Sequence, residues 1–368
     1  MQPKILTKRA VASLRRGLSD WYEREARDLP WRRTKDPYLI WISEVMLQQT
    51  RVDQALPYYE RFVRAFPTVV DLGRADLSDV LRIWEGLGYY TRARNLHAAA
   101  RAILQQHGGD FPRAFADIRA LPGVGTYTAA AVASLAFSEP RAVVDGNVAR
   151  VLARLYGIDQ APANARARNT YARHAETLLD RKHPARHNQA MMELGARICT
   201  PANPLCAACP LAPWCTARKA GAQNRFPPKR VRPPVPHYNV AVGIIGRGGT
   251  EVLIQRRPES GLLGGLWEFP GGKQEDGEDL SETCARELRE ELGIEVEVDE
   301  LFFRLSHAYT HFKVTLHAFR CRLLSGVPDS RTGRPLVWAS LSDLERYAFP
   351  RANRKLIAEL RSRTGPAS

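Results

Sequence analysis

The chain has 368 residues, 44% of them hydrophobic and 25% charged, which favours two or three globular domains over one small core. No apolar run approaches the length of a bilayer-spanning helix, so we expect no membrane segment. The formal net charge of +15 favours a polyanionic partner, although a solvated surface can also carry such charge. Most of the excess lies in residues 1–218, which contain 31 Lys and Arg against 20 Asp and Glu.

The N-terminus is basic but not apolar. The first 19 residues contain five Lys or Arg and no acid, and they lack the hydrophobic centre of a secretory signal. A basic amphipathic first helix is therefore expected, with a transit peptide as the alternative. We expect a cytoplasmic protein without a secretion signal, associated with the nucleoid through DNA.

The hydrophobic pattern changes once along the chain. In the first part, segments such as "VDQALPYYERFVRAF" place apolar residues three and four apart between short Gly and Pro breaks, which predicts helices. The Pro-rich and basic stretch "GAQNRFPPKRVRPPVP" predicts an extended linker, and the β-rich runs "YNVAVGIIG" and "EVLIQRR" follow it. The pattern predicts a multidomain chain with an all-α domain at 1–225, a linker at 226–235 and an α+β domain at 236–368.

The segment "DPYLIWISEVMLQQT" predicts a helix that carries a buried acid. Asp36 can cap this helix, and Pro37 suits its first position. Ile40, Glu44 and Leu47 are three and four residues apart, so they share one face. A carboxylate between two aliphatic side chains tends to have a raised pKa, as a general acid requires. A glutamate at the polar edge of an amphipathic helix is the alternative interpretation.

A glycine turn and a later aspartate form a second candidate site. In "LPGVGTYTAA", Gly123 and Gly125 permit positive φ and let a phosphate approach bare amides, and a helix is predicted from Thr126. In "VVDGNVARVLARL", Asp145 and Asn147 precede a helical run, where capping and the helix dipole favour an ionised carboxylate. An ordinary turn and a structural cap are the respective alternatives.

Four of the six cysteines lie close together at 199–215. Cys199, Cys206, Cys209 and Cys215 have a C-x6-C-x2-C-x5-C spacing. Without a secretory signal, this clustering favours metal ligation in a reducing compartment over a disulfide framework. Four thiolates suit a tetrahedral zinc ion or an iron–sulfur cluster, and their chemistry alone does not choose between the two.

Two of these motifs carry a family resemblance. Together, "LPGVG" and "VDGNVARV" resemble the helix-hairpin-helix DNA glycosylase superfamily, and "WISEVMLQQT" closely resembles its adenine DNA glycosylases. Members that also cut the strand carry a lysine after the hairpin, but that position is Tyr127 here, and a tyrosine cannot form an imine. The resemblance implies a monofunctional glycosylase that hydrolyses the N-glycosidic bond of adenine opposite 8-oxoguanine or guanine, leaving an abasic site.

The resemblance also implies a role for each matching residue. Glu44 would protonate N7 of adenine, and Asp145 would stabilise the oxocarbenium-like sugar, a pairing of carboxyl roles like that of glycoside hydrolysis. Tyr127 and Asn147 would assist around the sugar. The pocket for the flipped-out adenine would be lined by Trp31, Arg32, Leu47 and Gln189.

Further matches concern the DNA and the cofactor. The DNA and the opposite base would be contacted by Gln49, Thr50, Leu87, Tyr89, Gly123 and Gly125. The cysteine spacing matches the 4Fe–4S loop of the family, so the resemblance implies that cofactor. The implied partner is double-stranded DNA with an A:8-oxoguanine or A:G mispair, bound by a monomer.

The tail contains a complete Nudix box. From Gly272 it reads G-x5-E-x7-R-E-L-R-E-E-L-G-I, which satisfies Gx5Ex7REUxEExGU with U a bulky aliphatic residue. Glu287, Glu290 and Glu291 would lie on one helical segment and suit Mg²⁺ or Mn²⁺. A solvated acidic helix would explain the charge but not the glycines. Upstream, "GGLWEFPGGK" resembles the Nudix enzymes that destroy 8-oxo-dGTP.

Two functions remain open for this tail. Adenine DNA glycosylases normally end in a related domain that reads 8-oxoguanine, and "LSHAYTHFKV" resembles its recognition loop, with Tyr309, Thr310 and His311 at the tip. A lesion sensor is favoured, since hydrolysis needs residues beyond the box. The alternative is a bifunctional chain that also hydrolyses 8-oxo-dGTP. A non-catalytic damage-binding protein is a third interpretation, which the presence of both Glu44 and Asp145 disfavours.

Overall fold

The chain forms two units in the computed structural model, which describes residues 6–162, 164–228, 234–259, 261, 263–309 and 312–364. One unit comprises Met1–Arg74 and Ala98–Arg232, and the other comprises Ala75–His97 and Pro233–Ser368. The second division falls within the expected linker at 226–235, of which 229–233 lie outside the described residues. The grouping of Ala75–His97 with the C-terminal residues differs from the expected boundary.

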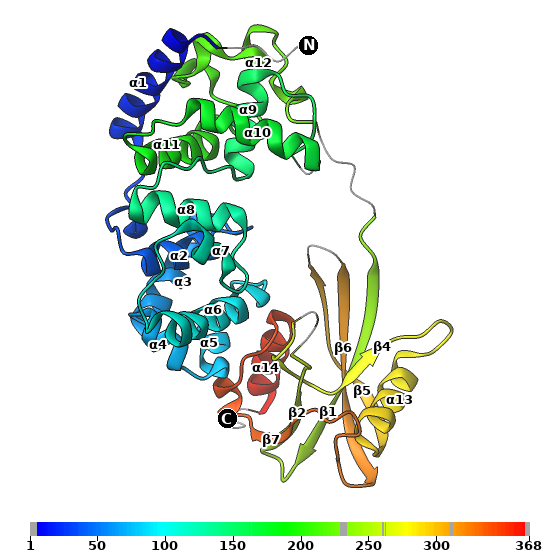
Figure 1. The fold of residues 1–368 in the computed structure, drawn as a ribbon. Helices are drawn as coiled ribbons and strands as arrows, with labels where there is room; N and C mark the ends of the chain where they lie inside the picture. Colours follow the sequence, from blue (N-terminus) through cyan, green and yellow to red (C-terminus); the bar gives the residue numbers. More distant parts are fainter. Residues whose placement is uncertain are drawn as a thin grey trace. The chain divides into compact units, whose positions relative to one another are not determined.

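The first part of the chain is helical, as its periodicity predicts, and no strand precedes residue 237 in the described ranges (Figure 1). The α-helices are α1 (Lys8–Glu25), α2 (Pro37–Met46), α3 (Val52–Ala65), α4 (Val69–Arg74), α5 (Leu77–Trp84), α6 (Thr91–His107), α7 (Phe115–Ala120), α8 (Thr126–Phe137), α9 (Gly146–Tyr156), α10 (Ala165–Leu178), α11 (Pro184–Arg197) and α12 (Thr216–Lys219). Short 3-10 turns are η1 (Pro30–Arg32), η2 (Cys206–Ala208), η3 (Ala212–Trp214) and η4 (Gln223–Arg225).

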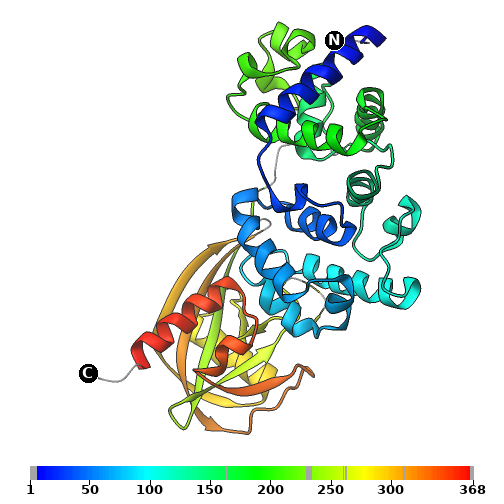
Figure 2. The ribbon, with the colours of Figure 1, turned by 90° about the vertical axis from the view of Figure 1, so that its left-hand side faces the viewer.

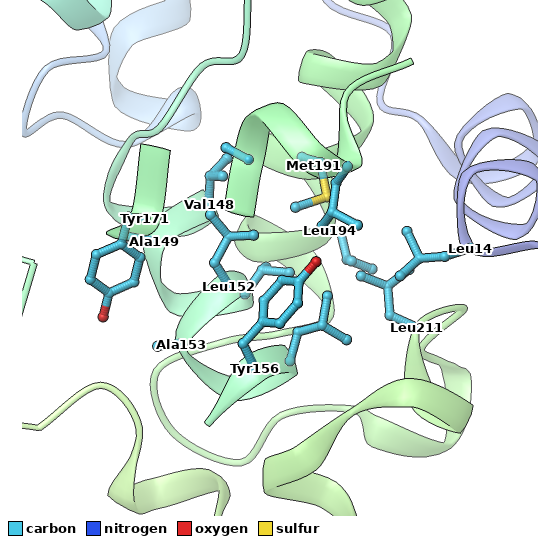
Figure 3. Close-up of a cluster of buried hydrophobic side chains, with 14 of the residues drawn as sticks. Leu14, Val148, Ala149, Leu152, Ala153, Tyr156, Tyr171, Met191, Leu194 and Leu211 are labelled. Atoms are coloured by element: carbon cyan, nitrogen blue, oxygen red, sulfur yellow. The ribbon is translucent and has the colours of Figure 1, made fainter. Parts of the chain in front are cut away.

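Helix α9 is the centre of a hydrophobic core (Figure 3). Its apolar face packs against residues from α1, α10, α11 and the cysteine loop, namely Leu14, Tyr171, Met191, Leu194 and Leu211. The helix ends at Gly157, whose φ of 72° is readily adopted by glycine. Because the helix is held along its length, the residues at its N-terminus have a fixed position.

The C-terminal part contains a mixed seven-stranded sheet. Strands β1 and β6 are parallel, with His237 opposite Lys313 and Ile245 opposite Cys321, while the other pairs are antiparallel. The strand order is β3-β2-β1-β6-β5, with β4 paired to β1 and β7 paired to β2. The strands are β1 (His237–Arg247), β2 (Glu251–Arg256), β3 (Trp267–Glu268), β4 (Gly271–Lys273), β5 (Glu295–Ala308), β6 (Lys313–Ser325) and β7 (Leu336–Ser340).

Two helices cover this sheet, and each closes a separate core. Helix α13 (Leu280–Leu292) packs Leu288 and Leu292 against Ala241 and Ile245. Helix α14 (Arg351–Thr364) lies along the other face, together with the 3-10 turn η5 (Asp343–Arg346), and Figure 2 shows α14 in front of the strands. No helix among the described residues is long and apolar enough to cross a membrane.

Candidate active site

One cavity of about 1220 Å³ in the helical unit is lined by candidate site residues from three segments that are distant in the sequence, 27–53, 127–150 and 162–196. Its wall is formed by residues of α2, α3, α8, α9, α10 and α11 and of the segments that precede and follow α2. Ten residues that the resemblance assigns to catalysis, adenine or the opposite base line this cavity, namely Trp31, Arg32, Glu44, Leu47, Gln49, Thr50, Tyr127, Asp145, Asn147 and Gln189. The cavity therefore has the acids, the aromatic rings and the amides that a base and its sugar would meet.

Glu44 is the buried acid of the cavity, with a residue exposure of 5%. Helix α2 begins where the sequence predicts, because Asp36 accepts a hydrogen bond from the amide of Tyr38 and Pro37 follows. The pKa of Glu44 is raised to about 7, chiefly by burial; the hydrogen bond from Tyr127 opposes this rise, and the charge of nearby Asp145 contributes to it. The expected raised pKa is confirmed, so Glu44 can hold or release a proton near neutral pH.

Tyr127 stands at the place where strand-cutting relatives would carry a lysine. Its hydroxyl donates to Oε2 of Glu44 at 2.6 Å and lies 3.6 Å from Sδ of Met192. Burial raises the pKa of Tyr127 well above its usual value, with Glu44 and Asp145 adding to the shift. The tyrosine is thus a protonated donor to the acid.

Asp145 caps the N-terminus of α9, as the sequence predicts. Its Oδ1 accepts from the amide of Val148 at 2.6 Å, and its Oδ2 accepts from Nδ2 of Asn147 at 2.9 Å. Burial raises the pKa of Asp145, and the bonds from Val148 and Asn147 and the charge of Arg150 oppose the shift. The raised direction runs against the expectation that capping and the helix dipole favour the ionised carboxylate, because the effect of burial outweighs them.

Arg150 links this aspartate to the cysteine loop. It donates to Oδ1 of Asn147 at 2.8 Å, to the carbonyl of Gly195 at 2.7 Å and to the carbonyl of Cys199 at 2.7 Å. The same guanidinium therefore holds Asn147, α11 and the first cysteine in place.

A buried ion-pair cluster in the cavity wall was missed by the sequence analysis. Glu193, with 1% exposure, accepts two bonds from the guanidinium of Arg27 at 2.6 and 2.7 Å, one from the backbone amide of Arg27 at 3.2 Å and one from Arg32 at 2.7 Å. Burial alone would raise the pKa of Glu193, but the bonds from the two arginines outweigh it and lower the pKa to about 2. The signal was available in part, because "MELGA" places an acid among small and apolar residues.

The residues expected to contact DNA do not all share the cavity. Gly123 has a φ of 71°, and a Cβ at Gly125 would meet no atom within 4 Å, so the turn before α8 is open to a phosphate. Gln49 and Tyr89 have positive φ of 61° and 49°, a strained backbone that is typical of functional positions. Leu87 is buried at 4% exposure, whereas Tyr89 is 37% exposed.

The four clustered cysteines affect one another electrostatically. Burial raises the pKa of Cys209 to about 12, and Cys199, Cys215 and Cys206 each raise it further. Cations and donors surround them: Arg154 donates to Sγ of Cys199 at 3.4 Å, and Gln223 donates to Sγ of Cys206 at 3.7 Å. The raised pKa keeps the Cys209 thiol protonated, and the four side chains as described are not arranged to hold a metal ion. Thiolate ligation would need the positive charge of a bound metal group.

The Nudix-box acids in α13 are engaged by arginines. Arg286 bonds Oε1 of Glu287 at 3.1 Å and Oε2 of Glu290 at 3.3 Å, and Arg334 bonds Oε1 of Glu291 at 2.6 Å. A Cβ at Gly272 would lie 2.2 Å from the Glu287 carboxylate, so this glycine makes room for that acid. Across the described ranges, no three His, Cys, Asp or Glu side chains are arranged to hold a metal ion.

The expected recognition loop is described only in part. Tyr309 stacks on Phe312 with ring centroids 4.7 Å apart, and its amide donates to the Phe312 carbonyl at 2.8 Å. Burial raises the pKa of Tyr309, so its hydroxyl stays protonated. Thr310 and His311 lie outside the described residues.

The helical fold, the glycine turn and the two-acid cavity define a class, the HhH-GPD superfamily of base excision DNA repair proteins, which residues 42–175 match. Residues 241–359 match the NUDIX domain. The adenine DNA glycosylases of Rattus norvegicus and Homo sapiens are 35% and 33% identical to 94% of this chain, which covers 78% and 74% of their lengths. The chain belongs to the adenine DNA glycosylase family, and it is a repair enzyme that hydrolyses an N-glycosyl bond.

Solved structures agree with the helical fold. A thermostable thymine-DNA glycosylase has a TM-score of 0.53 and 30% identity, and the match covers 58% of this chain and 98% of that one. A non-covalent endonuclease III–DNA complex has a TM-score of 0.50 at 23% identity over 59% of this chain and 99% of that one, which supports the fold alone.

Proposed function

We propose that the chain releases adenine mispaired with 8-oxoguanine or guanine from double-stranded DNA, leaving an abasic site. The observation that carries this proposal is the convergence of Glu44 and Asp145 in one cavity, with the pKa of Glu44 raised to about 7. A neutral Glu44 would donate its proton to N7 of adenine and make the base a better leaving group. The leaving adenine would be held by Trp31, Arg32, Leu47 and Gln189.

Asp145 would stabilise the positive charge that develops on the sugar. Its two oxygens are held by Val148 and Asn147, so the carboxylate is fixed before the bond breaks. Water then completes the hydrolysis, because Tyr127 lacks the amine that would trap the sugar as an imine. The product would be an uncut strand with an abasic site.

We further propose that the C-terminal domain reads the opposite base and does not hydrolyse nucleotides. The oxygen donors of Glu287 and Glu291 suit Mg²⁺ or Mn²⁺ chemically, but Arg286 and Arg334 neutralise them in the described structure. The stacked turn at Tyr309 and Phe312 offers aromatic surface and a hydroxyl donor instead. A lesion sensor fits this arrangement better than a second active site.

Tyr309→Ala is expected to reduce the preference for 8-oxoguanine over guanine opposite adenine by about tenfold, since base stacking is typically worth about 1–3 kcal/mol. The measurement is single-turnover adenine release from duplexes with each opposite base. Tyr309→Phe keeps the ring and separates stacking from the hydroxyl. An unchanged preference in Tyr309→Ala would contradict the sensor proposal, and equal activity opposite every base would contradict the substrate proposal.

We propose that Cys199, Cys206, Cys209 and Cys215 hold a 4Fe–4S cluster. Their spacing suits a group bound by four thiolates, and the guanidinium groups of Arg150 and Arg154 donate to the carbonyl and to Sγ of Cys199, where they would offset negative charge. The cluster would fix the loop against α9. The cavity is complete within one chain, which supports a monomer on DNA.

Cys209→Ser is expected to lose most of the bound iron and to lower the unfolding midpoint by several degrees, because metal binding and folding are coupled. Elemental analysis of the purified protein for iron and zinc makes the measurement. Cys321→Ala, at a buried cysteine of the sheet, is the matched control and should keep the iron. If the wild-type protein contains one zinc ion per chain and no iron, the cysteines hold zinc and the proposed cluster is wrong.

A further inference from the structure

One polar contact behind the cavity sets the orientation of an amide in its wall. The hydroxyl of Tyr22, on α1, donates to Oε1 of Gln189, on α11, at 2.5 Å. Gln189 lines the cavity, and Tyr22 is not among its lining residues. Tyr22 therefore acts on a bound base through Gln189.

The direction of donation follows from the two atoms, because Oε1 is a carbonyl oxygen and can only accept. Burial raises the pKa of Tyr22, the charges of nearby arginines oppose this rise, and the charge of Glu193 adds to it. The guanidinium carbon of Arg32 lies 5.6 Å from the centroid of the Tyr22 ring. The hydroxyl of Tyr22 therefore stays protonated and donates its hydrogen to Oε1 of Gln189.

An amide held in this way keeps one orientation in the cavity wall. A glutamine side chain has one acceptor atom, Oε1 with two lone pairs, and one donor group, Nε2 with two hydrogens. With one lone pair of Oε1 bound to Tyr22, the two ends of the amide cannot exchange places, and Nε2 stays available as the donor to a ligand. Without the tyrosine hydroxyl, the amide could rotate and offer either atom.

We propose that Tyr22 is a positioning residue for base selection, which fixes Gln189 as a hydrogen-bond donor to a ring nitrogen of adenine. N1, N3 and N7 of adenine are acceptors, and N7 is the proposed site of protonation by Glu44. Nε2 of Gln189 is therefore left for N1 or N3. This inference rests on the proposed adenine pocket and adds a determinant of specificity to it.

The test uses the full-length protein and duplexes that carry adenine, 1-deazaadenine or 3-deazaadenine opposite 8-oxoguanine. Each analogue replaces one acceptor nitrogen with a C–H group. Single-turnover release rates are measured for wild type, Tyr22→Phe, Gln189→Ala and the double variant. For each protein, the release rate of adenine is divided by that of each analogue. Each ratio is then divided by the same ratio for Gln189→Ala, which removes the intrinsic difference in reactivity between adenine and the analogue.

In the wild type, the adenine-to-analogue ratio for either 1-deazaadenine or 3-deazaadenine is expected to exceed the ratio of Gln189→Ala by about tenfold. A factor of this size corresponds to one buried hydrogen bond. Tyr22→Phe is expected to reduce this excess to within about threefold, and the double variant should match Gln189→Ala. Tyr58→Phe is the control, since Tyr58 is another half-buried tyrosine beside an arginine, Arg61, and is not a cavity residue. Its ratio should equal that of the wild type.

Two results would overturn the inference. One is a wild-type ratio no larger than that of Gln189→Ala for both analogues, and the other is a Tyr22→Phe ratio equal to the wild-type ratio. A merely structural role of Tyr22 would lower the unfolding midpoint and slow all substrates alike, leaving the ratios unchanged. If the wild type releases no adenine at all, the proposed function fails, and this outcome is distinct from a failure at Tyr22.

Discussion

Glu44→Gln is expected to reduce the rate of adenine release by about 10²–10⁴-fold, the usual contribution of a positioned general acid. The amide of glutamine keeps the shape of the side chain but has no proton to transfer to the base. Binding of substrate DNA should change little, because the loss falls on the chemical step. Single-turnover rates with excess enzyme, together with dissociation constants from electrophoretic mobility, make the measurement.

The same substitution is expected to stabilise the fold at alkaline pH. The folded-state pKa of about 7 exceeds the ordinary 4.5, so the folded state retains a proton that the unfolded state has lost. Wild-type stability therefore falls as pH rises from about 4.5 to about 7, by roughly 3 kcal/mol in total. Glu44→Gln removes this loss, so its unfolding midpoint should exceed that of the wild type at pH ~8 but not near pH ~5.

A matched control for Glu44 is available on the protein surface. Glu60 is an exposed glutamate of α3, and Glu60→Gln should change neither the release rate nor the pH dependence of unfolding. A wild-type release rate that does not decline between about pH 6 and pH 8 would argue against Glu44 as the acid. Full activity of Glu44→Gln would refute the mechanism.

Gly195→Ala is expected to destabilise the helical unit by about 2–3 kcal/mol and to reduce adenine release by at least about tenfold. A Cβ at this position of α11 would lie 2.6 Å from Cβ and 2.8 Å from the carbonyl oxygen of Asn147, so the backbones must separate. The side chain of Asn147 donates a hydrogen bond to Asp145, and a displacement of the α9 N-terminus would move the carboxylate that we propose to stabilise the sugar.

The control is a glycine in the middle of another helix of the same unit. A Cβ at Gly17 of α1 would meet only the carbonyl of Pro210 at 3.8 Å, an ordinary contact. Gly17→Ala is therefore expected to stabilise the protein by about 0.5–1 kcal/mol, the opposite sign. Thermal unfolding and release assays on both variants separate helix propensity from crowding at α9. If Gly195→Ala proves as active and stable as the wild type, the contact at Asn147 does not position Asp145.

The two acids of the cavity could be placed on their helices from the sequence because their signals are local. The caps of α2 and α9 lie in short sequence windows, and the apolar neighbours of Glu44 on its helix imply burial and a raised pKa. The glycine turn before α8 is equally local. The resemblance to adenine DNA glycosylases then predicted that Glu44 and Asp145, which lie in distant segments, belong to one site. The structure places both acids in one cavity.

The parts that could not be predicted depend on contacts between distant segments. The pairing of Glu193 with Arg27 and Arg32 spans more than 160 residues, and no spacing rule relates them. The pKa of Asp145 depends on how the whole cavity excludes water, which a capping motif does not reveal. The assignment of Ala75–His97 to the C-terminal unit likewise depends on packing, since an amphipathic helix does not specify its partner.

The arginine contacts of α13 offer a structural reason why a Nudix box can be retained in a domain that does not hydrolyse nucleotides. Arg286 joins Glu287 and Glu290 to Glu278 before the helix, and the missing side chain of Gly272 leaves space for Glu287. The pairing of Arg286 with Glu278 and the close approach of Gly272 to Glu287 give several of these positions structural contacts that a substitution would disturb. Natural selection for a stable domain is thus sufficient to retain the complete pattern in a lineage that has no use for nucleotide hydrolysis. In such a lineage, a match to the Nudix box indicates common descent with the hydrolases. Whether the box is active must then be judged from the groups that contact each of its carboxylates.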